Sequence, residues 1–238
     1  MLLAGCYPSD VLKKIPDGEF QRYLTDEYDY NGDHKLAKNE ALAASDMYIG
    51  IYFEGKNLDG IHYLENLEEL TAENSVLERI DVSRNRHLKK ITLDHMRSLR
   101  ELKIGPQIEE LILRYQSPEQ VIFTSTENLK TYINCYSNKL HTLGISSAPQ
   151  LTWLNVSYNQ ISELDLSGFP NLERFYCDGN NLTSLDLSSN LNLKSVTICD
   201  NPQLRVLWLK KGQQIEGINV NRNNRYAIDS QVEIKYKD

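Results

Sequence analysis

The chain has 238 residues, of which 40% are hydrophobic and 25% are charged. Its 33 acidic and 26 basic residues leave a formal charge of −7, which argues against a nucleic-acid partner because phosphate binding needs a basic surface. The sequence contains no run of about 18 apolar residues, which excludes a membrane-spanning helix.

Residues 1–16 are predicted to be the remnant of a lipobox followed by a linker. The run Leu3, Ala4, Gly5 and Cys6 resembles the lipobox of bacterial lipoproteins, where the precursor is cut and the cysteine acylated. The charged and apolar regions of a signal peptide do not precede it. We expect Cys6 to be lipidated, since two or more acyl chains give stable membrane attachment. The alternative is an ordinary free thiol.

Residues 17–47 are predicted to form a helix-loop-helix. Asp17 can cap the first helix, and apolar residues recur at helical spacing ahead of a polar loop. The loop of residues 29–40 matches the twelve-residue EF-hand pattern, with oxygen side chains at loop positions 1, 3, 5 and 12. We expect a structural Ca²⁺ ion, bound by the side chains of Asp29, Asn31, Asp33 and Glu40 and by the carbonyl of Lys35.

One residue departs from the EF-hand pattern. His34 stands at loop position 6, where glycine normally allows a sharp turn. A residue other than glycine in the left-handed conformation costs on the order of 1 kcal/mol, although histidine is found there more often than most. The alternative to calcium binding is therefore a degenerate loop that caps the next domain without metal.

Residues 48–66 are predicted to be a capping strand and a degenerate first repeat. Apolar residues alternate from Tyr48 to Phe53 as in a strand, and residues 57–64 resemble an incomplete repeat unit.

Residues 67–223 repeat with a period of about 21. The apolar positions of the unit at 151–166 coincide with those of the unit at 172–187. An asparagine follows each LxxLxL segment in the clearest units, at Asn138, Asn159, Asn180, Asn201 and Asn223. Earlier units carry Ser75, Met96 and Gln116 at this position. Such a period indicates an array in which each unit buries its apolar face against its neighbours.

These units, in the variety LxxLxCxxNxLxxLDLS, resemble the leucine-rich repeat family. The resemblance implies a right-handed leucine-rich repeat solenoid of the α/β class, strand-dominated and with little helix in the repeats, carrying the small N-terminal helix-loop-helix as a cap. The alternating second half of each unit predicts a second short strand. Residues 117–126 lack this pattern, and we expect a local irregularity there.

Several residue types take their roles from the repeat. Cys135 and Cys177 occupy an inward position and should be buried, whereas Cys199 lies one place further on and should be exposed. Asp81, Asp165 and Asp186 recur at one repeat position, which is more typical of turn chemistry than of catalysis.

The whole arrangement resembles the surface lipoproteins of gut Bacteroidetes that carry an EF-hand-like segment before leucine-rich repeats. That resemblance implies an exported protein, lipid-anchored at the outer membrane or cell surface. Residues 224–238 are predicted to cap the C-terminal end of the array, because an array needs polar caps at both ends.

Aromatic residues and arginines concentrate where the family places the exposed positions of its concave sheet. Such clusters are enriched at binding surfaces, although tyrosine also simply suits exposed strands. The predicted ligand-binding residues are Arg114, Tyr115, Tyr132, Tyr136, Trp153, Tyr158, Arg174 and Tyr176.

No enzyme motif accompanies these residues. The sequence has no GxSxG, HExxH or glycine-rich phosphate loop. The leading hypothesis is a non-enzymatic cell-surface protein that binds an extracellular protein or glycan on its concave face, with the membrane reached only through the lipid anchor. The alternative is a structural or assembly scaffold without a ligand on that face, and an enzyme is a remote third.

Overall fold

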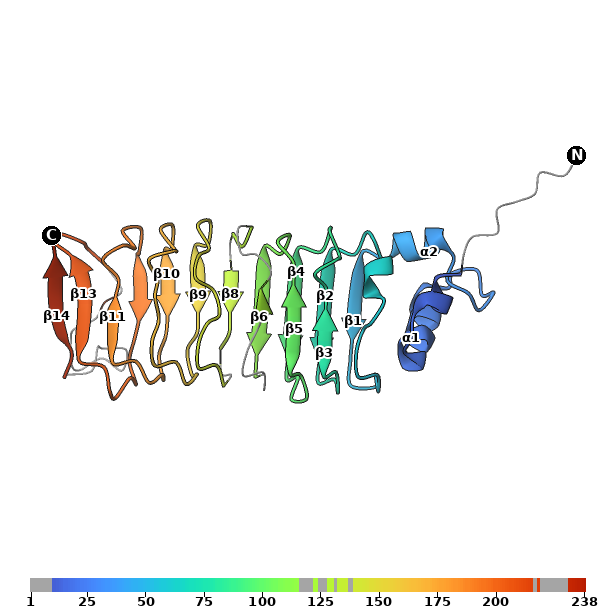
Figure 1. Ribbon diagram of the computed structural model, residues 1–238, viewed down its shortest axis with the longest axis horizontal. Coiled ribbons are helices and arrows are strands. Elements are labelled where there is room, and N and C mark those ends of the chain that lie inside the picture. Colours follow the sequence, from blue (N-terminus) through green and yellow to red (C-terminus); the bar gives the residue numbers. More distant parts are fainter. Residues whose placement is uncertain are drawn as a thin grey trace, which may run out of the picture.

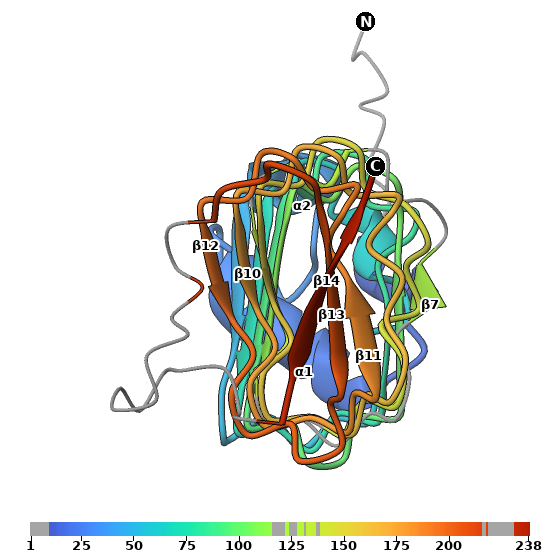
Figure 2. The same cartoon turned by 90° about the vertical axis from the view of Figure 1, so that its left-hand side faces the viewer.

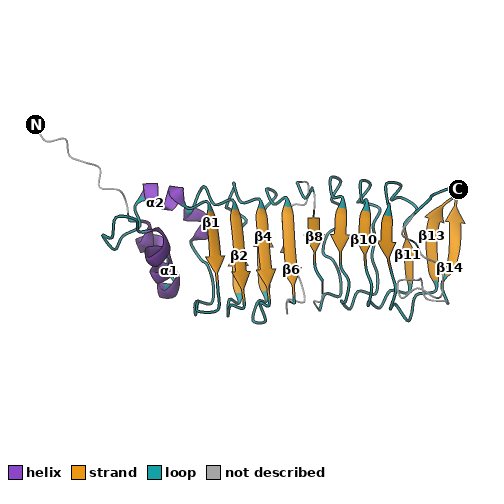
Figure 3. Ribbon diagram, turned by 180° about the vertical axis from the view of Figure 1, so that it is seen from behind, coloured by secondary structure: helices purple, strands orange, loops and turns teal. Residues whose placement is uncertain are grey.

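The chain folds into a stack of short parallel strands with a helical segment at one end (Figure 1). The computed structural model describes residues 10–115, 122–123, 128–130, 132–136, 139–215, 218 and 231–238, with the backbone alone for 122, 123 and 132. Figure 3 shows that the α-helices lie at the N-terminal end and that strands and loops form the rest. The predicted strand-dominated solenoid with a helical cap is confirmed. Among the described residues, no helix combines the length and hydrophobicity needed to cross a bilayer.

The helical cap is held to the solenoid by the side chains of its longest helix. The helices are a 3₁₀ turn (Val11–Lys14), α1 (Gly18–Tyr28) and α2 (Lys38–Ala43). As predicted, the Asp17 side chain caps α1 by accepting a hydrogen bond from the Phe20 amide at 2.9 Å. Phe20, Leu24 and Tyr28 are buried on one helix face. The Tyr28 hydroxyl donates to the Asp46 carbonyl at 2.5 Å, which joins α1 to the first strand.

One wall of the solenoid is an eight-stranded parallel sheet. In spatial order its strands are β1 (Asp46–Ile49), β2 (Glu69–Glu73), β4 (Lys90–Asp94), β6 (Glu110–Arg114), β8 (Tyr132–Asn134), β9 (Trp153–Asn155), β10 (Arg174–Tyr176) and β12 (Ser195–Thr197). Equivalent repeat positions lie side by side, as Leu70 does with Ile91 and Ile91 with Leu111. The inward leucine-type positions are buried, and the residues between them face outward.

The opposite wall contains the second short strand that the repeat pattern predicts (Figure 2). Its strands are β3 (Arg79–Asp81), β5 (Glu101–Ile104) and β7 (Ile122–Phe123), and then β11 (Ser184–Asp186), β13 (Val206–Lys210) and β14 (Glu233–Lys237). A further 3₁₀ turn covers Ile61–Tyr63. The segment expected as the C-terminal cap contains β14, which pairs with β13 along five residues. Residues 117–121 and 124–126, which make up most of the predicted irregularity, lie outside the described residues.

The recurring aspartates form turns, as predicted. Asp81, Asp165 and Asp186 each accept a hydrogen bond from the amide of the serine two residues later, at 2.9–3.1 Å. A carboxylate that bonds the backbone two residues on is the Asx-turn arrangement. These side chains therefore shape the corners between repeats.

Two local predictions need correction. The strand expected at 48–53 lies at Asp46–Ile49, because the chain turns after Gly50, whose carbonyl accepts from the Phe53 amide at 3.1 Å. Ile51 and Tyr52 are left exposed in that turn.

Cys199 was expected to be exposed, and that prediction is wrong: it is buried, like Cys135 and Cys177. It follows the three-residue strand β12, and both its amide and its thiol donate to the Asp178 carboxylate, at 2.9 and 3.0 Å. Ser157, at the same repeat position, is also buried. Asp178, at this position in the repeat between them, is only half-buried, so burial here depends on the side chain and its contacts. Burial and then the nearby Asp178 raise the pKa of the Cys199 thiol to about 12, so it stays protonated.

Candidate binding surface

Six of the eight predicted binding residues lie on the outer face of the eight-stranded sheet or at the edge where its strands end. They divide into two groups. The first group consists of Tyr115, Tyr136 and Tyr158. Together with His95, which contacts them, we call these residues the aromatic row. His95 stacks on Tyr115 with ring centroids 4.6 Å apart. Edge-to-face pairs continue from Tyr115 to Tyr136 at 5.9 Å and from Tyr136 to Tyr158 at 5.2 Å.

Three of the four residues of the aromatic row have a strained backbone. His95, Tyr115 and Tyr158 have φ of 52°, 52° and 58°, in the left-handed region. The same position in other repeats holds Asn74, Gly179 and Asp200, which are residue types that tolerate this conformation. A tyrosine there costs on the order of 1 kcal/mol. Strain of this kind clusters at functional sites, so its occurrence under exposed rings favours a binding role for them.

Two tyrosines of the aromatic row are exposed to solvent, whereas His95 and Tyr136 are half-buried. Tyr115 is 44% and Tyr158 47% exposed. The Tyr158 ring lies over Gly179, where a Cβ atom would come within 2.7 Å of it. Gly179 thus makes room for the ring. Desolvation and then the adjacent Tyr136 and Asp178 raise the pKa of the Tyr158 hydroxyl, which keeps it a neutral donor.

The second group lies on strands β9 and β10. The rings of Trp153 and Tyr176 are 5.4 Å apart, and Arg174 is the direct neighbour of Trp153 across the strand pair. Trp153 and Tyr176 are half-buried, whereas Arg174 is exposed. Tyr132 is placed only by its backbone in β8, and its side chain lies outside the described residues.

Arg114 is engaged within the protein. It forms an ion pair with Asp94 at 3.1 Å, and the other oxygen of Asp94 lies 2.5 Å from Nδ1 of His95. Asp94 is mostly buried between these two groups, with a side-chain exposure of 16%. The carboxylate balances the charge of Arg114 and lies beside the imidazole of His95 at the end of the aromatic row.

His95 was not among the predicted binding residues. It occupies the same repeat position as Tyr115 and Tyr158, directly before the asparagine position, so the alignment of repeats contained the signal. His95 was left out because histidine was counted as a polar residue, although its imidazole ring can stack like the tyrosine rings.

The five predicted calcium ligands lie in one loop, but the structure brings only some of them together. The Asn31 amide donates to Glu40 at 3.0 Å. The Asp29 carboxylate accepts from the backbone amides of Gly32, Asp33 and His34 at 2.8–3.2 Å. The Lys35 amide donates to Asp33 at 3.0 Å. Within the described part of the chain, no group of three or more His, Cys, Asp or Glu side chains is arranged to hold a metal ion.

The 29–40 loop turns sharply at His34. His34 has φ of 61°, the left-handed conformation that position 6 requires, and Glu40 is buried at the start of α2 with one oxygen accepting from the Ala37 amide at 2.8 Å. The predicted lipidation residue, Cys6, lies outside the described residues.

Comparison with known proteins identifies the fold of the chain but does not assign the chain to a family. No family model matches the chain, and no curated protein matches it. Solved structures do match. An internalin-like protein of Listeria monocytogenes is 16% identical with a TM-score of 0.57, over 85% of this chain and 63% of that one. The leucine-rich repeat domain of LRIM1 is 13% identical with a TM-score of 0.53, over 91% and 70%.

A leucine-rich repeat protein of Leptospira interrogans is 16% identical with a TM-score of 0.50, over 71% of this chain. The present chain spans 52% of the length of that protein. These likenesses show that the fold is a leucine-rich repeat solenoid.

Proposed function

We propose that this protein is a non-enzymatic binding protein of the cell surface, which uses the outer face of its eight-stranded sheet to bind another extracellular protein. The observation that supports this most is the aromatic row: four rings in mutual contact at the edge of the sheet, of which Tyr115 and Tyr158 are exposed. Leucine-rich repeat solenoids are a fold suited to protein interaction, since they offer extended surfaces.

The geometry of the rings favours a protein over a glycan. Sugar rings stack on flat aromatic faces, whereas Tyr115, Tyr136 and Tyr158 meet edge to face at interplanar angles of 79° and 67°. Each ring therefore offers edges and a hydroxyl beside a neighbouring face. Edges and hydroxyls of rigid tyrosines suit an irregular protein surface with a few anchor points. A glycan remains the second candidate, supported by the half-buried Trp153.

A binding screen with matched variants tests the proposal. Arrays of purified extracellular proteins and of glycans would be probed with the wild type, with a Trp153→Ala and Tyr158→Ala double variant, and with Tyr236→Ala. Tyr236 is an exposed tyrosine on β14, away from the row. We expect a protein ligand whose affinity falls at least about tenfold in the double variant only. Unchanged affinity in the double variant would instead support a scaffold that makes its contacts elsewhere.

Two further parts of the proposal concern the N-terminal region. We propose that Cys6 is acylated and anchors the protein at the membrane; metabolic labelling with a fatty-acid alkyne should mark the wild type and spare Cys6→Ser. We also propose that the 29–40 loop binds a structural Ca²⁺ ion through the residues named above. The support is its spacing and the conformation of His34.

Calorimetry with Ca²⁺ tests the second part. If the ion binds only the folded state, millimolar Ca²⁺ should raise the melting temperature, and chelator should reverse the effect. Glu40→Gln should abolish the binding heat. An unchanged melting temperature with no binding heat would refute the calcium site.

A further inference from the structure

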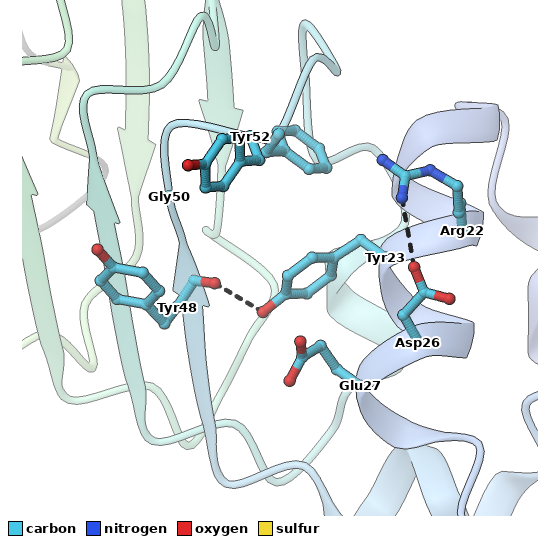
Figure 4. Close-up of a pocket in the computed structure, with 8 residues that line it drawn as sticks. Arg22, Tyr23, Asp26, Glu27, Tyr48, Gly50 and Tyr52 are labelled. Carbon is cyan, nitrogen blue, oxygen red and sulfur yellow. Dashed lines mark hydrogen bonds and ion pairs between the residues drawn. The ribbon is translucent and has the colours of Figure 1, made fainter.

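A pocket of about 270 Å³ lies between the helical cap and the first strand of the solenoid (Figure 4). Helix α1 contributes one side of it through Arg22, Asp26 and Glu27. The other side is formed by β1 and the turn that follows, including Tyr48 and Tyr52. The pocket is separate from the aromatic row, which lies over later repeats.

Aromatic rings form the walls of this pocket, and one of them is rigid. The Tyr23 hydroxyl donates to the Tyr48 carbonyl at 2.8 Å (Figure 4). Its ring packs edge to face against Phe53, with centroids 5.9 Å apart. Tyr52, by contrast, is 88% exposed and Tyr48 56%. Together with Ile51, they form an exposed apolar group in one short segment, of the kind that marks an interaction site.

The charges around the pocket are mostly negative. Arg22 is already paired, with Glu19 at 2.7 Å and with Asp26 at 3.3 Å. Glu27 has no ion pair or hydrogen bond within the described residues. The charge of Glu27 acts on the pocket wall: burial and then the Glu27 carboxylate raise the pKa of the Tyr23 hydroxyl to about 12. An additional cation would therefore be attracted.

We propose that this pocket binds the side chain of a lysine or arginine exposed on a partner protein. The aliphatic part of such a side chain would lie against the rings of Tyr23 and Tyr52, and its cationic group would meet Glu27. Cations are attracted to aromatic faces as well as to carboxylates, and long cationic side chains bury their stems against apolar surface. An apolar ligand would desolvate Glu27 without a partner, and an anion would be repelled.

The proposal can be tested on the full chain with small probes. NMR titrations would use N-acetyl-lysine amide and N-acetyl-arginine amide, with N-acetyl-norleucine amide and N-acetyl-glutamine amide as neutral controls. We expect saturable shifts of the Tyr23, Gly50 and Tyr52 signals with a cationic probe, with a Kd on the order of 1 mM. The relative affinity of the two cationic probes identifies the preferred side chain. Norleucine tests whether the apolar stem is sufficient, because it lacks the charge of lysine.

Two variants assign the contacts. Glu27→Gln should weaken the cationic probe about two- to fivefold, as expected for an exposed charge pair. Tyr52→Ala should weaken it about threefold through the lost cation–π contact. Both residues are exposed, so the fold is expected to persist. Glu163→Gln and Tyr236→Ala, exposed and remote, serve as matched controls and should leave binding unchanged.

Three results would overturn the proposal: equal binding of norleucine and the cationic probes, unaltered affinity in Glu27→Gln, or no saturable shifts at up to tens of millimolar probe. The outcome is independent of the aromatic row, since Trp153 and Tyr158 take no part in it.

Discussion

The two halves of the eight-stranded sheet end their strands in different ways. In the C-terminal half, β9, β10 and β12 have three residues each, and each is followed by a buried asparagine: Asn159, Asn180 or Asn201. In the N-terminal half, β2, β4 and β6 have five residues each. There the equivalent positions hold Ser75 and Met96, which are also buried.

The buried asparagines hydrogen-bond backbone carbonyls that are paired within longer strands in the other half. The Asn180 side-chain amide donates to the carbonyls of Val156, Cys177 and Asp178 at 3.0–3.2 Å, and its oxygen accepts from the Ile161 amide at 3.1 Å. In the N-terminal half the strand pairing instead continues two residues further, through Ala72 with Leu93 and Glu73 with Asp94. In the C-terminal half some backbone bonds between repeats still continue past the short strands, from the Val156 amide to the Tyr176 carbonyl and from the Tyr158 amide to the Asp178 carbonyl. Asparagine therefore pairs the buried carbonyls that this interrupted ladder leaves without a backbone partner.

The largest effect is expected from Asn180→Ala. The Val156 and Cys177 carbonyls keep one bond each, from Asn159 and Asn201, but the Ile161 amide loses its partner in a buried position. We expect a loss of about 3 kcal/mol in the free energy of unfolding, measured by urea denaturation, with faster hydrogen exchange at Ile161.

Asn192→Ala is the matched control for that prediction. Asn192 is exposed, and its amide also bonds a carbonyl of the preceding repeat, that of Pro170, at 3.1 Å. Its loss should cost less than about 1 kcal/mol because water can replace the bond. Equal losses in the two variants would remove the distinction between the ladder asparagines and ordinary surface asparagines.

A smaller effect is expected when asparagine is transplanted into the other half. Met96 is fully buried, and the carbonyls that an asparagine would bond are already within the strand ladder. Met96→Asn should therefore leave a buried amide unsatisfied and lower the free energy of unfolding by about 2 kcal/mol. Met96→Leu should cost less than about 1.5 kcal/mol. The melting temperatures of the two variants test this prediction. If Met96→Asn melts at the same temperature as Met96→Leu, the two halves of the sheet do not differ at this position.

The repeat pattern predicted most of the fold because each inward position is constrained by its neighbours in both directions. Stacking of the units explains why four features could be predicted: the period, the second strand, the turn aspartates and the burial of Cys135 and Cys177. Cys199 was misplaced because the repeat pattern does not show contacts between side chains of neighbouring repeats, and the Cys199 thiol is buried against the Asp178 carboxylate of the preceding repeat. The shift of the first strand has a similar cause, since Ile51 and Tyr52 continue the apolar alternation beyond the turn.

The candidate surface was predicted in composition but not in arrangement. Sequence placed Tyr115 and Tyr158 on one face, but the edge-to-face order of the rings and the pairing of Arg114 with Asp94 depend on side-chain geometry. The pocket beside Tyr23 and Tyr52 was not predicted, because it joins a helix of the cap to a turn about 25 residues away in the chain. Periodicity carries no information about contacts between a repeat and a segment outside it.

The smallest effect concerns the feature that both halves share, the turn aspartate. Bonds from the Ser167 amide and then from its hydroxyl lower the pKa of Asp165 in the folded state. A lowered folded pKa adds stability above the unfolded pKa of about 3.9, and this stability is lost as the pH falls through the folded pKa. Because Asp165 is exposed, solvent screening reduces the gain to roughly a few tenths of a kcal/mol.

The difference in stability between the wild type and Asp165→Asn should accordingly be present at pH 7 and shrink below about pH 4. The same substitution at Asp81, which accepts from Ser83 at 3.1 Å, should cost a similar amount at pH 7 because the turn is the same. Glu163→Gln removes an exposed carboxylate with no hydrogen bond within the described residues, and it should leave the free energy of unfolding at pH 7 nearly unchanged. A larger loss for Asp81→Asn than for Asp165→Asn would mean that the halves differ at their corners as well as at their strand ends.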